Sequence, residues 1–196
     1  MIRQDPQVTG CPKHHPLNAR MTDHLFMRLI LTVDVADQRV IGLRRKGPYP
    51  KIQEMIREIA EYCTKQGITI IGPPAYICQE TRQETAKQAA ETGDSVREVV
   101  FPIEGEAEAS GDLSVYEIPG GKMARIIHMG PYRDRHDTYQ ELFAWLAKND
   151  LELNGPVREV YINDPAVTDE DILVTWIYAP ISDTGSTGEP SARAWK

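Results

Sequence analysis

Acidic and aromatic side chains recur at every second position near the C-terminal end of the sequence. In the apolar run 157–162, Glu159 and Tyr161 fall on one side of a predicted strand, because successive strand side chains point to opposite faces. Trp176 and Tyr178 share a side of the last predicted strand for the same reason. A buried carboxylate needs a partner, and a ligand cation can provide one while aromatic ring faces attract the same cation. This pattern predicts a pocket for flat, apolar, often cationic molecules.

The tripeptide Gly-Pro-Tyr occurs at 47–49 and again at 130–132. Each copy is followed by a second Gly-Pro, at 72–73 and 155–156, and one offset of 83 residues relates both pairs. Two pairs of landmarks at one offset predict an internal duplication of the chain.

The predicted duplication extends the candidate site into the first half. Tyr76 takes the position equivalent to Glu159, and alignment of the last strand of each half gives Glu98 the place of Trp176. We expect these side chains to share one surface, although each tyrosine could instead be packed within the sheet. The two glutamates could act as an acid–base pair if they lay close together. The residues expected to contact a ligand are Tyr76, Glu98, Tyr116, Tyr132, Glu159, Tyr161, Trp176 and Tyr178.

Apolar periodicity predicts the elements that position these residues. In 51–66, Ile52, Met55, Ile59 and Cys63 form the apolar stripe of an amphipathic helix. Runs of β-branched residues bounded by Gly and Pro predict strands. The predicted strands are 26–35, 39–45, 75–78, 96–103, 113–118, 122–128, 157–162 and 172–180, and the second predicted helix is 134–149. Short connections at 36–38 and 119–121 predict turns between consecutive strands.

Each half therefore reads strand–strand–helix–strand–strand, which predicts the α+β class. One helix on a four-stranded antiparallel sheet is a thin layer, so two such units are expected to share a longer sheet with both helices on one face. A pseudo-twofold axis then relates the halves, and a ligand groove lies between them. We expect a flexible extension at 1–22, one domain at 23–181 with halves 26–103 and 112–181, and a disordered tail at 182–196.

Composition and charge exclude several classes of function. The chain has 196 residues and a formal net charge of −7 with scattered Lys and Arg, which argues against a sequence-independent nucleic-acid surface. No apolar run approaches the roughly 20 residues that cross a bilayer, and no signal peptide is visible. Three cysteines make no disulfide framework, so a cytoplasmic location is expected. Cys11, His14 and His15 lack the second ligand pair of structural zinc, so neither a metal nor a cofactor is expected.

The second half is similar in sequence to a known family. The matching segments are His128-Met-Gly-Pro-Tyr132, Ala144-Trp-Leu146, Gly155-Pro-Val-Arg-Glu-Val-Tyr-Ile-Asn-Asp-Pro165 and Thr175-Trp-Ile-Tyr-Ala-Pro-Ile181. They resemble the GyrI-like, AraC-type effector-binding superfamily. The resemblance implies a duplicated strand–helix–strand–strand module that binds ligands in the groove between its halves. It also implies that Glu159 contacts cationic ligands and that Tyr178 lines the pocket. Trp176 stands where many members have a second glutamate, which implies a more apolar pocket.

Three functions follow from these observations. The first is a stand-alone small-molecule-binding protein for aromatic, cationic or lipophilic ligands, related to multidrug-responsive transcription regulators and without direct contact to nucleic acid or membrane. The alternative is a hydrolase of electrophilic, cyclopropanoid-like molecules in which Glu159 activates or orients water, since the resemblance extends to relatives with such activity. A second alternative, binding to a protein partner as gyrase inhibitors do, rests on the resemblance alone.

Overall fold

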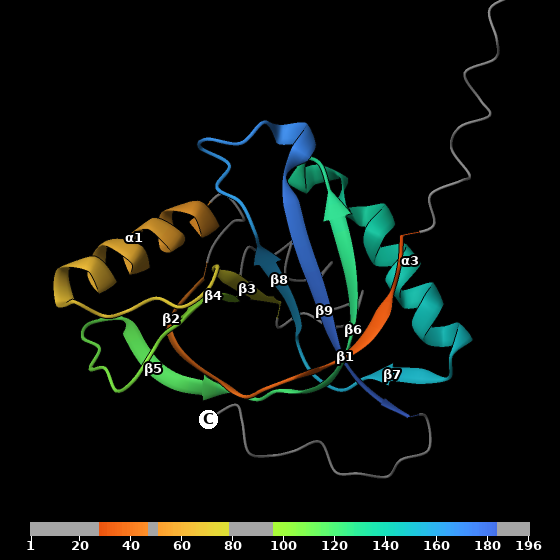
Figure 1. Cartoon of the computed structure of the whole chain (residues 1–196), viewed down its shortest axis with the longest axis horizontal. Helices are drawn as coiled ribbons and strands as arrows, with labels where there is room; N and C mark the ends of the chain where they lie inside the picture. Colours follow the sequence, from red (N-terminus) through yellow and green to blue (C-terminus); the bar gives the residue numbers. More distant parts are fainter. Residues whose placement is uncertain (1–27, 47–50, 79–95, 184–196) are drawn as a thin grey trace, which may run out of the picture.

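The computed structural model describes residues 28–46, 51–78 and 96–183. This part of the chain is an α+β domain with an open antiparallel sheet of nine strands and two α-helices (Figure 1). In chain order the elements are β1 (Leu31–Val35), β2 (Gln38–Lys46), α1 (Lys51–Gln66), β3 (Ala75–Cys78), β4 (Val96–Pro102), β5 (Leu113–Ile118), β6 (Gly121–Met129), the 3-10 helix η1 (Tyr132–Asp134), α3 (Arg135–Lys148), β7 (Leu151–Leu153), β8 (Val157–Tyr161), the 3-10 helix η2 (Glu170–Ile172) and β9 (Val174–Asp183). The predicted fold class is therefore confirmed.

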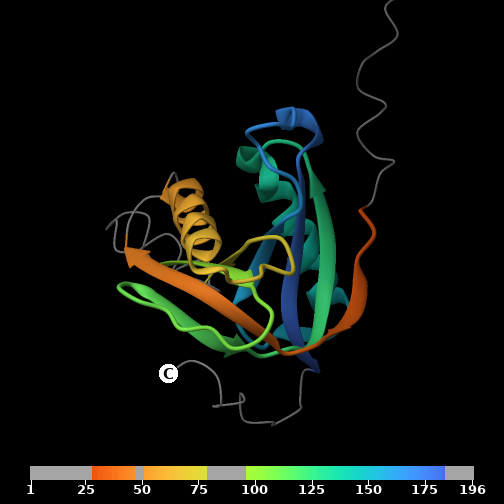
Figure 2. The same ribbon diagram turned by 60° about the vertical axis from the view of Figure 1, so that its left-hand side comes forward.

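The two helices cover the same face of the sheet, as predicted. Helix α1 buries Met55 and Ile59 against a core that includes Ile41 of β2. Helix α3 buries Leu142 in a second core with Ile126 of β6. The opposite face, which we call the open face, carries a third apolar cluster that includes Val40, Ile77 and Val100. Figure 1 views the open face of the second half, with β6 and β9 in front of α3, and Figure 2 shows α1 above β2 and β5.

The strand order corrects the expectation that each half contributes its own four strands as one unit of the shared sheet. The order is β1-β6-β9-β8-β3-β4-β2-β5, with β7 pairing with the end of β9. Strand β1 thus pairs with β6 of the second half, and β5 pairs with β2 of the first. The connections at 36–37 and 119–120 are crossings between the halves, and the expectation of turns between paired neighbours was wrong.

The two crossing connections touch each other at Gly120. Its backbone N–H donates a 2.6 Å hydrogen bond to the Asp37 carboxylate. A Cβ atom at Gly120 would lie 2.0 Å from the carbonyl oxygen of Val35, so only glycine allows this approach. The halves are therefore joined by an exchange of strands as well as by the central β3–β8 pair.

The strand order reads the same from both ends when β1 is matched with β5, β2 with β6, β3 with β8 and β4 with β9. This is the arrangement expected of a pseudo-twofold axis between β3 and β8. Strand order does not test common ancestry, so the duplication of the sequence stays a prediction.

Several predictions concern segments outside the described residues. These are the extension at 1–22 with Cys11, His14 and His15, the first Gly-Pro-Tyr at 47–49, and most of the tail. The sequence predicts that the tail starts at 182, but β9 continues to Asp183. No helix of the described part is long and apolar enough to cross a membrane.

Candidate functional site

The eight predicted ligand contacts lie on two faces of the sheet, so the expectation of one shared surface was wrong. The helix-covered face carries Tyr76, Tyr132, Glu159 and Tyr161, and the open face carries Glu98, Tyr116, Trp176 and Tyr178. The pairing of β8 with β9 is the reason, because Glu159 is opposite Ile177 and Val160 is opposite Trp176. Paired residues of neighbouring strands point to the same face. Glu159 therefore shares its face with Ile177, which is fully buried under α3.

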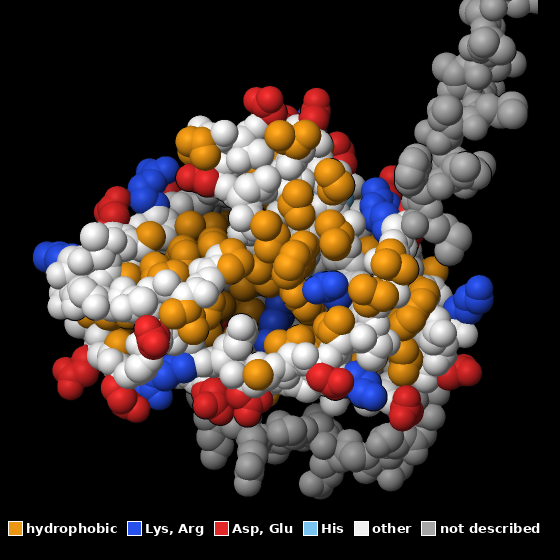
Figure 3. Space-filling view, in the orientation of Figure 1, with side chains coloured by type: hydrophobic (Ala, Val, Ile, Leu, Met, Phe, Trp, Pro, Cys, Tyr) orange, Lys and Arg blue, Asp and Glu red, His pale blue; other side chains and the backbone are white. Residues whose placement is uncertain are grey.

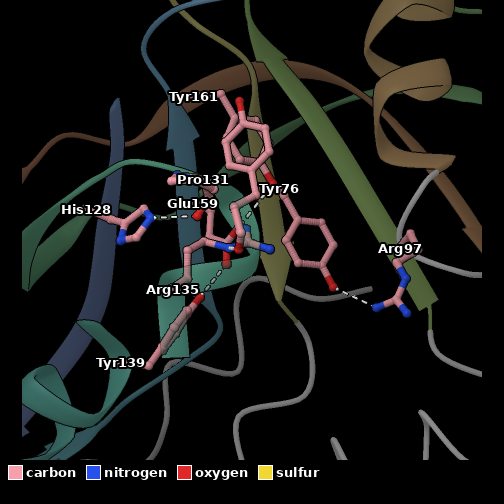
Figure 4. Close-up of polar contacts among 9 residues, drawn as sticks. Tyr76, Arg97, His128, Pro131, Arg135, Tyr139, Glu159 and Tyr161 are labelled. Atoms are coloured by element: carbon pink, nitrogen blue, oxygen red, sulfur yellow. Dashed lines mark hydrogen bonds and ion pairs between the residues drawn. The ribbon is translucent and has the colours of Figure 1, made fainter. Parts of the chain in front are cut away.

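Glu159 is the centre of a buried polar cluster on the helix-covered face (Figure 4). Arg135, in the first turn of α3, forms an ion pair with one carboxylate oxygen. The Tyr139 hydroxyl donates to Oε1 over 2.7 Å, and the Tyr161 hydroxyl donates to Oε2 over 3.0 Å. The Arg135 Nε also donates to the carbonyl oxygen of Tyr132 over 2.7 Å. Glu159 is only 3% exposed, so this cluster replaces water as the partner of its charge.

Neutral phenols surround the ion pair of Glu159 and Arg135. Burial and the nearby Glu159 carboxylate raise the pKa of Tyr139 and of Tyr161 well above the usual tyrosine value. Burial acts to lower the pKa of Arg135, but Glu159, Tyr161 and Tyr139 together outweigh it and the net shift is upward. Both tyrosines are therefore hydrogen-bond donors at neutral pH.

A groove on the same face, which we call the helix-side groove, lies beside this cluster and has a volume of about 510 Å³. Its wall includes Tyr132 and Tyr161, whose ring centroids are 5.3 Å apart in an edge-to-face arrangement. The guanidinium of Arg135 lies 5.6 Å from the centre of the Tyr132 ring. The other lining residues are Gln53, Ile56, Arg57 and Ala60 of α1, Pro73, Pro74, Phe101, and the segment 162–166.

His128 supports the loop that carries Tyr132. Its Nε2 atom lies 3.1 Å from the carbonyl oxygen of Pro131, and its Nδ1 atom lies 2.9 Å from the Thr138 hydroxyl. A carbonyl oxygen can only accept, so Nε2 carries the proton and Nδ1 accepts from Thr138 in the neutral ring. Burial lowers the pKa of His128. The side chain is 1% exposed.

Glu98 and Tyr116 form a separate cluster on the open face. The Tyr116 hydroxyl donates to Glu98, and Arg44 donates to the same carboxylate over 3.0 Å. Burial and Glu98 raise the pKa of Tyr116 well above its usual value. Glu98 and Glu159 lie on opposite faces of the sheet, so the condition for an acid–base pair, that they lie close together, is not met.

Tyr76 sits on the helix-covered face but is 1% exposed, inside the core under α1. Its hydroxyl accepts a hydrogen bond of 3.1 Å from Arg97. Tyr76 does not line the helix-side groove. Among the described residues, no group of three or more acidic, His or Cys side chains could hold a metal ion.

Trp176 and Tyr178 line a second pocket, of about 280 Å³, on the open face. We call it the open-face pocket. The ring centroids of the two residues are 6.4 Å apart, edge to face. Both side chains are partly exposed, unlike Tyr161, which is buried. The expected aromatic wall is present, but no predicted glutamate lines it.

Sequence reasoning missed three residues of these sites. Arg135 and Tyr139 are four positions apart on α3, and that spacing places both on one helix face. This signal is present in the sequence, but helical spacing alone does not indicate that the two side chains meet a carboxylate of β8. Strand alternation turns Arg158 away from Glu159 and indicates no role for it, although it lines the open-face pocket.

Comparison with known proteins identifies the family. Residues 32–182 match the GyrI-like small molecule binding domain, and the chain belongs to this family. No curated protein matches the sequence. The chain thus belongs to a family of small-molecule-binding domains.

Solved structures share this fold at low sequence identity. The EcmrR C-terminal domain matches with a TM-score of 0.70 and 18% identity, over 81% of this chain and 99% of that domain. EcmrR in a DNA complex matches with a TM-score of 0.72 and 18% identity, over 82% of this chain; this chain spans 60% of that EcmrR chain. A hydrolase from Listeria innocua matches with a TM-score of 0.57 and 14% identity, over 78% of this chain and 91% of the hydrolase. At these identities the likeness concerns the fold.

Proposed function

We propose that this domain binds a lipophilic aromatic molecule, with a preference for cations, in the helix-side groove. The observation that carries the proposal is the Tyr132–Tyr161 pair in the groove wall, with the Tyr161 hydroxyl bonded to the buried Glu159 carboxylate. The groove volume of about 510 Å³ lies within the usual range for ligand pockets, about 300–1,000 Å³. Its lining combines apolar side chains with a small number of polar groups, as small-molecule sites do.

The preference for cations is proposed to come from the tyrosine rings. Glu159 is 3% exposed and already accepts from Arg135 and two phenols, so direct contact with a ligand would require this cluster to open. A phenol that donates its proton to a carboxylate gains electron density, which strengthens the attraction of its ring for a cation. Glu159 would thus act through Tyr161. This role differs from the direct contact that the family resemblance implies.

A pair of probes with matched shape and opposite charge tests this proposal. Tetraphenylphosphonium and tetraphenylborate have nearly the same shape and opposite charge, and isothermal titration calorimetry gives the affinity for each. We expect the phosphonium to bind more tightly. Tyr161→Leu should weaken its binding by about 2- to 30-fold, the range of a cation–π contact of about 0.5–2 kcal/mol. Tyr161→Phe should keep the ring but reduce the preference for the cation.

Tyr62→Leu is the matched control, because Tyr62 lies on α1, hydrogen-bonds to Ser110 and does not line the groove. The Tyr62→Leu variant should bind the phosphonium with the same affinity as the unmodified protein. Equal binding of the two probes, or unchanged binding after Tyr161→Leu, would show the proposal to be wrong.

A hydrolytic role for Glu159 gains no support from the geometry. The sequence hypothesis assumes a lone carboxylate in an apolar setting, free to take a proton from water. Among the described residues, Glu159 is instead paired with Arg135 and accepts from Tyr139 and Tyr161. A carboxylate held by these three partners is not free to take a proton from water.

A further inference from the structure

The open-face pocket differs in charge from the helix-side groove. Of the described residues that line it, Arg158 alone is charged at neutral pH. The others are mainly apolar, and include Val40, Val100 and Met123. Figure 3 shows this face, where hydrophobic side chains gather over β6, β8 and β9, and basic side chains lie within the patch while the acidic ones lie around its edge.

Arg158 is buried without a carboxylate partner. Arg158 is 4% exposed. Its guanidinium forms no ion pair with any residue that the structure describes. The Nη2 group donates to the carbonyl oxygen of Pro119, and the buried Nε has no hydrogen-bond partner. Asp37 lies near enough to act on Arg158 electrostatically, but its Oδ1 accepts from Gly120.

We propose that the open-face pocket binds a small aromatic acid, with the ligand carboxylate paired to Arg158 and its ring against Trp176 and Tyr178. A guanidinium pairs with a carboxylate through charge-assisted hydrogen bonds, and such a ligand supplies the acceptor that the buried Nε lacks. This site is separate from the helix-side groove, because the two lie on opposite faces of the sheet and share only Pro73 among their lining residues.

The surroundings of Arg158 favour an anion over a cation or a neutral molecule. Burial lowers the pKa of Arg158 to about 10, with partial compensation by Asp37, so the guanidinium is still charged at neutral pH. In register across the sheet, Arg125 of β6, Tyr178 of β9 and Arg158 of β8 form one row on this face. The Arg125 guanidinium stacks 5.0 Å from the centre of the Trp176 ring. Positive charge therefore lies on both sides of the aromatic wall.

The volume and shape of the pocket limit the size of the ligand. The pocket measures about 280 Å³, at the lower end of the usual range of about 300–1,000 Å³. One or two fused rings with one carboxylate fit this description better than a multi-ring drug. Edge-to-face packing of Trp176 and Tyr178 leaves ring surfaces for such a ligand to contact.

Calorimetric titration with 2-naphthoate tests the proposal, with 2-naphthamide as the neutral molecule of the same shape. We expect the acid to bind and the amide to bind at least tenfold more weakly. Arg158→Met should weaken naphthoate binding by at least about tenfold, and Arg158→Lys should retain part of it. Arg133→Met is the matched control, because Arg133 is exposed, pairs with Glu170 and lies outside the pocket; naphthoate affinity should not change.

Two further measurements keep the proposal falsifiable whatever the stability of the variants. In the unmodified protein, the NMR signal of the Arg158 Nε–H should shift on addition of naphthoate, and saturating tetraphenylphosphonium should not displace the acid. Absence of naphthoate binding, equal binding of the amide, unchanged affinity in Arg158→Met, or displacement by the phosphonium would overturn the proposal.

Discussion

Two adjacent residues of β8 give the two faces of the sheet opposite chemical properties. Glu159 points beneath α3, where Arg135, Tyr139 and Tyr161 satisfy its charge. Arg158 points to the open face, where its guanidinium donates to one backbone carbonyl and contacts no carboxylate among the residues that the structure describes. Because strand side chains alternate, a single Arg-Glu dipeptide places one buried charge in each environment. The Glu159 charge is paired within the protein, whereas Arg158, which has no carboxylate partner in the described part of the chain, indicates an anionic ligand.

The neutral state of His128 predicts how stability depends on pH. Burial lowers its pKa in the folded protein, whereas the unfolded chain has the ordinary value of about 6.5. The unfolded state therefore binds a proton first as the pH falls. The stability that neutral His128 contributes is complete above about pH 6.5 and is lost as the pH falls from there through the lowered folded-state pKa.

Urea unfolding between pH 7.5 and 5.5 measures this effect. We expect the unfolding free energy to decrease with a contribution from His128 of at most about 1.4 kcal/mol per pH unit. His128→Gln, which can still donate to Pro131 and accept from Thr138, should flatten the dependence. His136→Gln is the control, because His136 is exposed on α3 and its loss should leave the slope unchanged. An equal slope in His128→Gln and the unmodified protein would contradict the assignment.

At the scale of elements, local sequence patterns predicted most of the secondary structure. The bounds of α1, β3 and β5 are those predicted, because an apolar stripe or a β-branched run ends at Gly, Pro or a polar residue in each case. Strand β7 was missed. It has only three residues, and it is a strand because it pairs with the end of β9. A pairing between distant segments leaves no pattern in the local sequence.

The relation between elements could not be predicted in the same way. Alternation correctly sorted the side chains within β8 and within β9, but the register between these strands decides which sides coincide. The sequence suggested Glu159 beside Trp176, whereas the pairing puts Glu159 beside Ile177. Likewise, the connections at 36–37 and 119–120 resemble hairpin turns locally, and only long-range pairing reveals them as crossings. The site was therefore predicted as a set of residues but not as a geometry.

The crossing at Gly120 makes a prediction about stability. Gly120→Ala should destabilise the protein by about 3 kcal/mol or more, because the new Cβ would lie 2.0 Å from the Val35 carbonyl oxygen and the crossing must open. Gly105→Ala is the matched control. Gly105 has a φ of +73° and open space where a Cβ atom would lie, so its cost should be limited to about 1 kcal/mol of backbone strain. Urea unfolding compares the two, and equal losses would show that the crossing does not constrain the fold.

At the scale of the whole molecule, the exchange of β1 and β5 makes each half depend on the other. The first half donates β1 to β6, and the second half donates β5 to β2, so neither sheet is complete within its own stretch of chain. The central β3–β8 pair joins the halves into one sheet. Both proposed pockets include residues from both halves, and a ligand in either pocket would therefore contact this joined structure.

This interdependence predicts a single unfolding transition that a mutation in one half shifts in both. Leu43 of β2 is fully buried in the core under α1, and Leu43→Ala should cost about 2–5 kcal/mol. In a Trp195→Phe background the fluorescence reports Trp145 and Trp176, both in the second half. In Leu43→Ala we expect the urea midpoint measured by this fluorescence and the midpoint measured by circular dichroism to decrease by the same amount, because one cooperative unit unfolds in a single transition. Val167→Ala, at a residue 84% exposed, should move neither midpoint. A fluorescence midpoint that stays in place while the circular dichroism becomes biphasic would mean that the halves unfold separately despite their exchanged strands.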